Sequence, residues 1–264
     1  MLIQMRLALM DSGRALGLWR GWLYLAWHDV TARYRRSILG PFWIALGMLA
    51  ASLALSISWG AISGQAIHDY VPYVMAGLLV WTHFVGIFFT EAPELFVAAQ
   101  ASIRSTAFPF MFYVFRSVAR SLIVCAHTLV AFLMVTALLG NLKVPSWQIL
   151  PGLLVSSLVV VALAPVIGMA SARYRDLRLM LPFAAQILFF ATPVFWHADT
   201  LTGPGAAFVH YNPFYYLLEV VRAPLLGHAA SGRVWMVVMS ILAVSILVWF
   251  VSFSAARRRI AFWI

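Results

Sequence analysis

Residues 144–172 read VPSWQILPGLLVSSLVVVALAPVIGMASA, a run without Asp, Glu, Lys or Arg. A helix needs about 20 residues to cross the roughly 30 Å hydrocarbon core of a bilayer, and this run is long enough. Further charge-free runs of that kind are residues 37–68, 70–90, 121–142, 179–198 and 234–256. We therefore predict an all-α integral membrane protein with six transmembrane helices.

The composition supports a membrane protein. Of the 264 residues, 64% are hydrophobic and 10% are charged, and the mean hydropathy is +0.93. Soluble domains average about 45–50% apolar and about 25% charged residues. A soluble enzyme, a disordered chain and a secreted disulfide scaffold are thereby excluded, the last also because Cys125 is the only cysteine.

One further uncharged run, residues 200–218, is interrupted by glycine and proline at positions 203–205 and 213. Unpaired backbone groups are not tolerated in a lipid-exposed span. We therefore predict short helices here, on the outer membrane surface or re-entrant, between spans five and six.

Basic residues are distributed unequally between the predicted loops. One set of loops, together with both chain ends, holds fifteen arginines: Arg6, Arg14, Arg20, Arg33, Arg35, Arg36, Arg104, Arg116, Arg120, Arg173, Arg175, Arg178, Arg257, Arg258 and Arg259. The opposite side holds Lys143, Arg222 and Arg233. Since positive charge stays in the cytoplasm, we predict that both termini are cytoplasmic. Topology then explains the net charge of +10 without nucleic acid as a partner.

The first forty residues contain a predicted amphipathic helix. Apolar residues recur at steps of three and four over positions 18–30, and three of them are tryptophans. Such a helix is suited to the membrane interface, either as an anchor or beside a substrate entrance or partner. We divide the chain into a cytoplasmic N-terminal segment, 1–36, and a membrane domain, 37–264.

The predicted spans contain little reactive chemistry. Buried charge is the usual marker of an ion or proton path, and the six runs contain no Asp, Glu, Lys or Arg; the candidates for proton transfer within them are His83 and His127. No cluster has metal-ligand spacing. A phosphate-binding loop needs a Gly-Lys-Ser/Thr sequence, whereas the single lysine, Lys143, follows Leu142. We expect no enzyme activity, metal or cofactor in this chain, so any ATP-driven step requires another polypeptide.

Three further patterns have a structural and a functional interpretation. Trp81, Phe84 and Phe88 share one face of span two and could line a glycan path or serve packing. Residues 91–104 could form a protruding helix that docks a soluble subunit, or a plain connection. Glu219 and Arg222 could pair on one helix face, as a surface ion pair of little energetic weight.

Several motifs, in order along the chain, resemble one family. They are DVTARYRRSILGPFW at 29–43, ARYRDL at 172–177, TPVFW at 192–196, NPFY at 212–215 with RAPLLG at 222–227, and RRRIAFW at 257–263. This set resembles ABC-2 type permeases that export polysaccharides: O-antigen (lipopolysaccharide), capsule and teichoic acid. The RYRRS and NPFY forms are closest to the O-antigen branch.

The resemblance implies a half-transporter of the bacterial inner membrane, surrounded by membrane lipids. Two copies would form a channel, and two ATPase subunits, which bind ATP and Mg, would dock below it. The cargo would be a polyprenyl-diphosphate-linked polysaccharide moved to the outer face. The alternatives are a capsule or teichoic acid exporter, an ABC-2 drug or lipid exporter, and a membrane enzyme or assembly factor acting on the same glycan.

The resemblance also suggests roles for individual residues. The expected substrate entrance, where arginines attract the pyrophosphate or merely anchor the chain, is Arg33, Arg35, Arg36, Leu39 and Gly40. The expected coupling element is Gln100, Ile103 and Arg104. The channel-lining candidates are Trp81, Phe84 and Phe88, and the outer re-entrant region includes Asn212, Pro213, Glu219 and Arg222.

Overall fold

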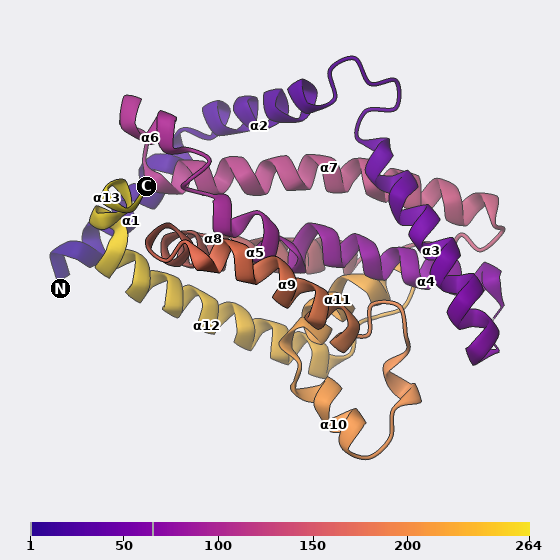
Figure 1. Cartoon of the computed structure of the whole chain (residues 1–264). Coiled ribbons are helices and arrows are strands. Elements are labelled where there is room, and N and C mark those ends of the chain that lie inside the picture. Colours follow the sequence, from indigo (N-terminus) through magenta and orange to yellow (C-terminus); the bar gives the residue numbers. More distant parts are fainter. Residues whose placement is uncertain (1, 65) are drawn as a thin grey trace.

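The computed structural model describes residues 2–64 and 66–264 and is built of helices and short loops (Figure 1). Within these two ranges no strand occurs, so the predicted all-α class is confirmed. In chain order the elements are α1 (Leu2–Gly17), α2 (Trp19–Arg33), α3 (Phe42–Ser63), α4 (Ile67–Val80), η1 (Trp81–Val85), α5 (Ile87–Thr90), η2 (Ala92–Glu94), α6 (Gln100–Ser105), α7 (Phe110–Leu138), α8 (Ile149–Arg173), α9 (Asp176–Ala191), η3 (Ala198–Thr200), α10 (Pro204–Tyr211), α11 (Pro213–Leu225), α12 (Gly232–Ala256), η4 (Arg257–Arg259) and α13 (Ile260–Trp263).

Four helical segments of the described chain are long and apolar enough to cross a membrane: Phe42–Gly60, Phe110–Leu138, Ile149–Arg173 and Gly232–Trp263. A fifth span is formed if Ile67–Val85 and Ile87–Glu94, which meet at 42°, are taken as one broken helix. The remaining predicted span, residues 179–198, corresponds to α9, which has only 16 residues. The structure thus supports four or five spans, and the count of six stays a prediction.

The bend in the α4–α5 segment has a local cause. Residues Trp81–Val85 form a π-helical turn, and the Gly86 amide donates to the Trp81 carbonyl oxygen, five residues back, at 2.6 Å. Glycine permits this close approach, because a Cβ at position 86 would lie only 3.0 Å from the same oxygen. Turns of this kind are a known cause of kinks in long helices.

Helix α8 lies inside the bundle, where it packs against α12, α11, α7 and η2. The approach of α11 depends on Gly152, because a Cβ there would lie 2.6 Å from the Val220 carbonyl oxygen. Gly77 of α4 has the same function toward the loop after α9, because a Cβ there would collide with the Val194 carbonyl oxygen. These two glycines set the spacing of the core.

The predicted N-terminal amphipathic helix is α2, and it is preceded by a second helix, α1. The broad apolar face of α2 divides into two stripes. Trp22, Ala26 and Val30 pack toward α7, with the Trp22 and Phe115 ring centroids 5.7 Å apart, whereas Trp19 and Trp27 are exposed. In Figure 1, α2 runs beside the first half of α7, so half of the predicted interface face is used within the chain.

Asp11 of α1 joins three segments that are distant in sequence. Its buried carboxylate accepts hydrogen bonds from the backbone amides of Phe110 (3.3 Å) and Met111 (3.0 Å) at the start of α7. It also accepts one from Arg257 Nε (3.0 Å) after α12. The α7 N-cap residue is Pro109, which has no side-chain acceptor. Asp11 therefore supplies the missing cap from another helix.

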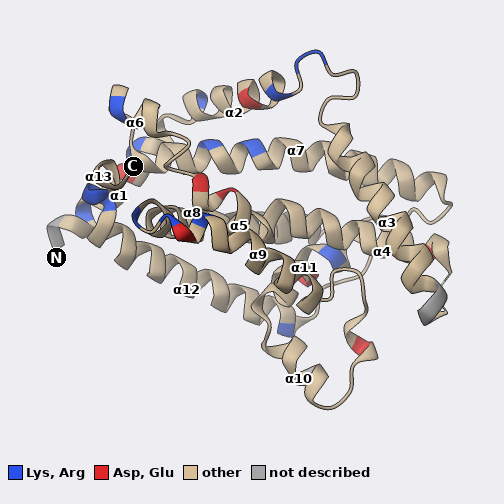
Figure 2. Ribbon diagram, viewed as in Figure 1, with Lys and Arg blue, Asp and Glu red and all other residues tan. Residues whose placement is uncertain are grey.

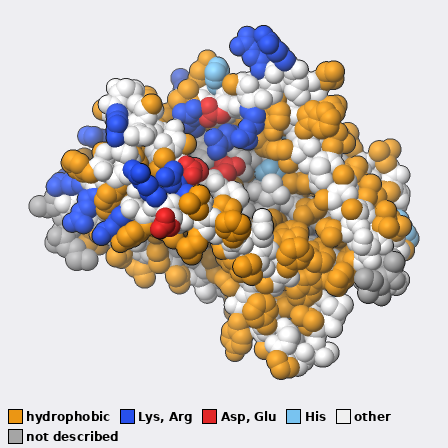
Figure 3. Space-filling model, in the orientation of Figure 1, with side chains coloured by type: hydrophobic (Ala, Val, Ile, Leu, Met, Phe, Trp, Pro, Cys, Tyr) orange, Lys and Arg blue, Asp and Glu red, His pale blue; other side chains and the backbone are white. Residues whose placement is uncertain are grey.

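The charged side chains are concentrated at one end of the bundle. Figure 2 shows most Lys, Arg, Asp and Glu on the side where both chain ends, α6 and α13 lie, and Figure 3 shows the charged patch on the surface there. The opposite end, near α10 and the far ends of α3 and α7, has few charges. The arginines that the topology prediction placed on one side are thus grouped in space.

Candidate functional site

A charged cleft of about 380 Å³ opens between α2, the α5–η2 segment and the start of α7. It lies within the charged end of the molecule. Each element contributes through helical spacing: Asp29 and Arg33 are one turn apart on α2, and Arg116 and Arg120 are one turn apart on α7. Glu91 and Glu94 come from the chain between them.

Ion pairs hold the three walls of the charged cleft together. Arg116 makes a bidentate contact with Asp29, with Nε–Oδ2 2.7 Å and Nη2–Oδ1 2.6 Å. Arg120 Nη2 donates to Glu91 Oε2 at 2.7 Å. The bidentate form is the strong, directional one, so α2 is held to α7 by geometry as well as by apolar contact.

One arginine of the charged cleft, Arg33, is not used in an ion pair with any described residue. Glu94 pairs with Arg178 Nη1 at 3.5 Å, so all three carboxylates that line the cleft have an arginine partner. Arg33 also lines it and makes no ion pair or side-chain hydrogen bond within the described residues. An exposed guanidinium beside a polar cavity is suited to a phosphate or carboxylate.

The other predicted entrance residues lie beyond the charged cleft. Arg35 and Arg36 are exposed on the loop after α2, with Arg36 in a left-handed conformation (φ 67°). Gly40 (φ 53°) also has a positive φ, and its amide donates to Ser37 Oγ at 3.1 Å. Leu39 is 40% exposed. The structure thus places Arg33 in the cleft and the remaining four on a turn next to it.

The predicted aromatic stripe lies in the interior of the single chain. Trp81, Phe84 and Phe88 are 9%, 2% and 4% exposed, and Trp81 meets Phe189 of α9 edge to face, with centroids 5.4 Å apart. The contacts shown here are packing contacts, and a channel-lining role stays a prediction.

The predicted coupling element is a helix. Gln100, Ile103 and Arg104 all belong to α6, which protrudes at the charged end (Figure 1). Arg104 Nη2 donates to the Ile264 carbonyl oxygen at 2.7 Å, and Arg173 of α8 lies over the Trp263 ring, 5.6 Å from its centroid. The segment after α12 is therefore anchored to both α6 and α8.

The segment predicted to be outer and re-entrant forms two short helices, α10 and α11. Asn212 caps α11: its Oδ1 accepts from the Phe214 amide at 3.0 Å, and its Nδ2 donates to Thr192 Oγ1 at 2.9 Å. Pro213 occupies the first helical position, where its missing N–H costs nothing. Asn212 and Pro213 together therefore fix the start of α11.

Glu219 and Arg222 form an ion pair, as the spacing predicts, but the pair is not a weak surface contact. Arg222 is 3% exposed, and its Nη2 lies 2.6 Å from Glu219 Oε2. Its Nη1 donates to the Pro193 carbonyl oxygen at 2.6 Å, and the guanidinium lies over the Tyr73 ring, 4.3 Å from its centroid. A buried cation needs such partners, and Arg222 thereby joins α11, α4 and the loop after α9.

Sequence reasoning missed the pairing in the charged cleft. It used Arg116 and Arg120 only as topology markers, although their i, i+4 spacing predicts a common face. Nothing in the sequence predicts which carboxylates they meet, since Asp29 and Glu91 are 87 and 29 residues away.

Comparison with known proteins gives one positive result. The sequence model of the ABC-2 type transporter family matches residues 20–226, a range that includes nearly all of α2, the charged cleft, α6, α10 and α11. A search of curated proteins finds no match.

Proposed function

This chain belongs to the ABC-2 type transporter family, and we propose that it is the permease subunit of an exporter of polyprenyl-diphosphate-linked polysaccharide of the O-antigen type. Membership makes it a multi-pass membrane component of an ABC transporter. The cargo, its direction and the bacterial inner membrane as location are our proposal, supported by the motif set at 29–43, 172–177, 192–196, 212–227 and 257–263.

One observation carries the choice of an anionic cargo: Arg33 lines the charged cleft, and every carboxylate there already has an arginine partner. A diphosphate could thus meet Arg33 without competing with those ion pairs. Arg35, Arg36, Leu39 and Gly40 would form the approach to this entrance, on the turn between α2 and α3.

Transport requires partners that supply energy and complete the path. We propose two ATPase subunits, which bind ATP and Mg, below α6, and a second copy of this chain across the channel. Helix α9 would complete six spans with both termini cytoplasmic, and α10 and α11 would lie re-entrant at the outer face. Trp81, Phe84 and Phe88 would line the path only if the spans separate during transport, since this chain covers them now.

The entrance is tested by complementation in the native host after depletion of the chromosomal copy. Depletion should remove polysaccharide from the surface and accumulate its lipid-linked form inside. We expect Arg33→Gln to restore export poorly, whereas Arg20→Gln, an exposed arginine of α2 outside the charged cleft, should restore it fully. Normal surface glycan after depletion, with no redundant exporter, would refute the cargo and favour the drug or lipid exporter.

Coupling is tested separately through α6. Arg104→Glu should separate ATP hydrolysis from export while membrane insertion is unchanged. Arg6→Glu, the same change at an exposed arginine of α1, is the control. Normal export by the Arg104 variant would remove Arg104 from the docking surface.

A further inference from the structure

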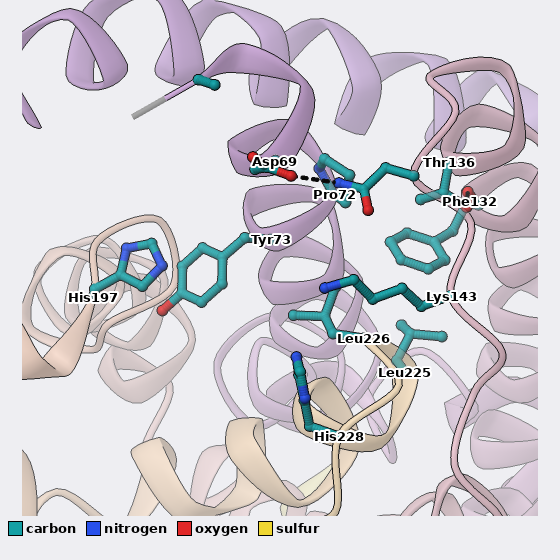
Figure 4. Close-up of a pocket in the computed structure, with 12 residues that line it drawn as sticks. Asp69, Pro72, Tyr73, Phe132, Thr136, Lys143, His197, Leu225, Leu226 and His228 are labelled. Carbon is teal, nitrogen blue, oxygen red and sulfur yellow. Dashed lines mark hydrogen bonds between the residues drawn. The ribbon is translucent and has the colours of Figure 1, made fainter. Parts of the chain in front are cut away.

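A second cavity, of about 460 Å³, lies at the end of the bundle away from the charged cleft (Figure 4). Its walls come from α4, the end of α7, the loop that follows, the loop after α9 and the end of α11. The polar groups that line it are Asp69, Tyr73, Thr136, Asn141, Lys143, His197 and His228. We call it the distal pocket, and no predicted site residue lines it.

Lys143 has no carboxylate partner among the described residues of the distal pocket, although the carboxylate of Asp69 also lines it. Lys143, the only lysine of the chain, makes no ion pair or side-chain hydrogen bond within the described residues. The nearby carboxylate of Asp69 is already engaged, since it accepts from Asn141 Nδ2 at 2.8 Å and lies 3.2 Å from His68 Nε2. The pocket therefore presents a free ammonium group to whatever enters it.

Other polar side chains share the open space with Lys143. Figure 4 shows the Lys143 amine, the His228 ring and the Tyr73 ring around one open space. The guanidinium of Arg222 lies over the Tyr73 ring, 4.3 Å from the ring centroid, but its charge is compensated by Glu219, so Lys143 supplies the net positive charge here. Phe132, Leu225 and Leu226 form an apolar wall. Donors beside an apolar wall are typical of a ligand pocket.

The loop that carries Lys143 is held in place. The Ser146 amide donates to the Pro224 carbonyl oxygen at 2.8 Å. Gly227 (φ 84°) is packed against Lys143 so closely that a Cβ there would lie 3.0 Å from the lysine Cβ. The ammonium group is thus presented from a positioned backbone, which lowers the ordering cost of binding.

From this geometry we propose that the distal pocket binds an oxyanion, a phosphate or carboxylate, through Lys143 and His228. The apolar wall receives the body of the molecule that carries the anion. A lipid head group and a soluble acidic sugar share this chemistry. The proposal concerns binding to the chain itself and does not rest on the proposed transport function.

The test is thermal unfolding of the purified full chain in nanodiscs, because a ligand that binds only the folded state raises the unfolding temperature. Inorganic phosphate and glucuronate are titrated in phosphatidylcholine nanodiscs, and phosphatidylglycerol replaces part of the lipid in a parallel series. We expect a saturable stabilisation by at least one probe. Stabilisation by a soluble probe identifies a soluble anion as the source, and stabilisation by phosphatidylglycerol alone identifies a lipid head group.

Two variants make the test specific. Lys143→Met keeps the length of the side chain and should weaken the apparent affinity at least tenfold. Arg233→Gln removes an exposed cation outside the distal pocket and should leave it unchanged. The proposal is overturned if no probe stabilises the wild type, or if Lys143→Met responds as the wild type does. Polysaccharide export is not measured, so failure here is distinct from failure of the proposed function.

Discussion

Replacing Asp11 with asparagine should loosen the junction between α1, α7 and the segment after α12. The carboxylate accepts two backbone N–H groups of α7 and the Arg257 guanidinium. Asparagine keeps one oxygen as an acceptor but loses the charge. The α7 cap would then be incomplete, and Arg257 would lose its ion pair.

The magnitude follows from those contacts. Loss of an N-cap costs about 0.5–2 kcal/mol, and loss of a negative charge near a helix N-terminus costs about 0.3–1 kcal/mol. The Arg257 side chain is 24% exposed, so it regains some hydration and adds little. We expect Asp11→Asn to lower the free energy of unfolding by about 2 kcal/mol. At roughly 2–4 °C per kcal/mol for a chain near this size, this corresponds to about 4–8 °C in Tm.

The assay is thermal unfolding of the purified chain in detergent, together with hydrogen exchange at the start of α7. Asp176→Asn is the matched control, because it also removes a negative charge from a helix N-terminus, that of α9, but the exposed carboxylate has no hydrogen bond or ion pair within the described residues. Its effect should stay within about 1 kcal/mol. Equal Tm values for Asp11→Asn and the wild type, with unchanged exchange at residues 110 and 111, would refute the capping role.

Three further predictions concern the packing between α4, α11 and the loop after α9. Gly77→Ala should destabilise the chain by about 1–3 kcal/mol, because its Cβ would collide with the Val194 carbonyl oxygen. Gly47→Ala, which has open space around it, is the control and should leave Tm unchanged; equal Tm values for the two variants would contradict the close approach. Arg222→Met should lower Tm, because it leaves Glu219 and the Pro193 carbonyl oxygen without their donor, and Arg233→Gln serves as its exposed control. Burial, aided by the nearby Arg222, lowers the pKa of His197 below the usual 6.5, so the folded state should lose stability as pH falls below about 6.5. In His197→Phe the Tm difference between pH 7.5 and pH 5.5 should be smaller than in the wild type. An unchanged Tm difference would show that other groups cause the pH dependence.

The membrane helices could be predicted largely from charge-free runs, but their ends could not. Helix α7 begins at Phe110, well before the predicted start at 121, because Arg116 and Arg120 are neutralised by carboxylates from other elements and do not end the helix. Helix α9 ends at Ala191, earlier than predicted, because Pro193 follows and disfavours helical backbone at Thr192.

The candidate site could be predicted in part. Arg33 was identified from its motif, and the structure places it in the charged cleft. The burial of Arg222 could not be foreseen, because the i, i+3 spacing to Glu219 is the same for an exposed pair. Its partners Tyr73 and Pro193 belong to other elements, and only the tertiary arrangement brings them together.

The contact between Asp11 and Arg257 also has a consequence for biogenesis. The two residues are 246 positions apart, so during synthesis Asp11 emerges long before its partner exists. Helix α1 can reach α7 earlier, but the three-way junction closes only after the last long helix has been inserted. The N-terminal helix therefore completes its contacts only after the C-terminal segment has been made. A ribosome that stalls before Arg257 leaves a nascent protein in which α1 lacks its contact with Arg257.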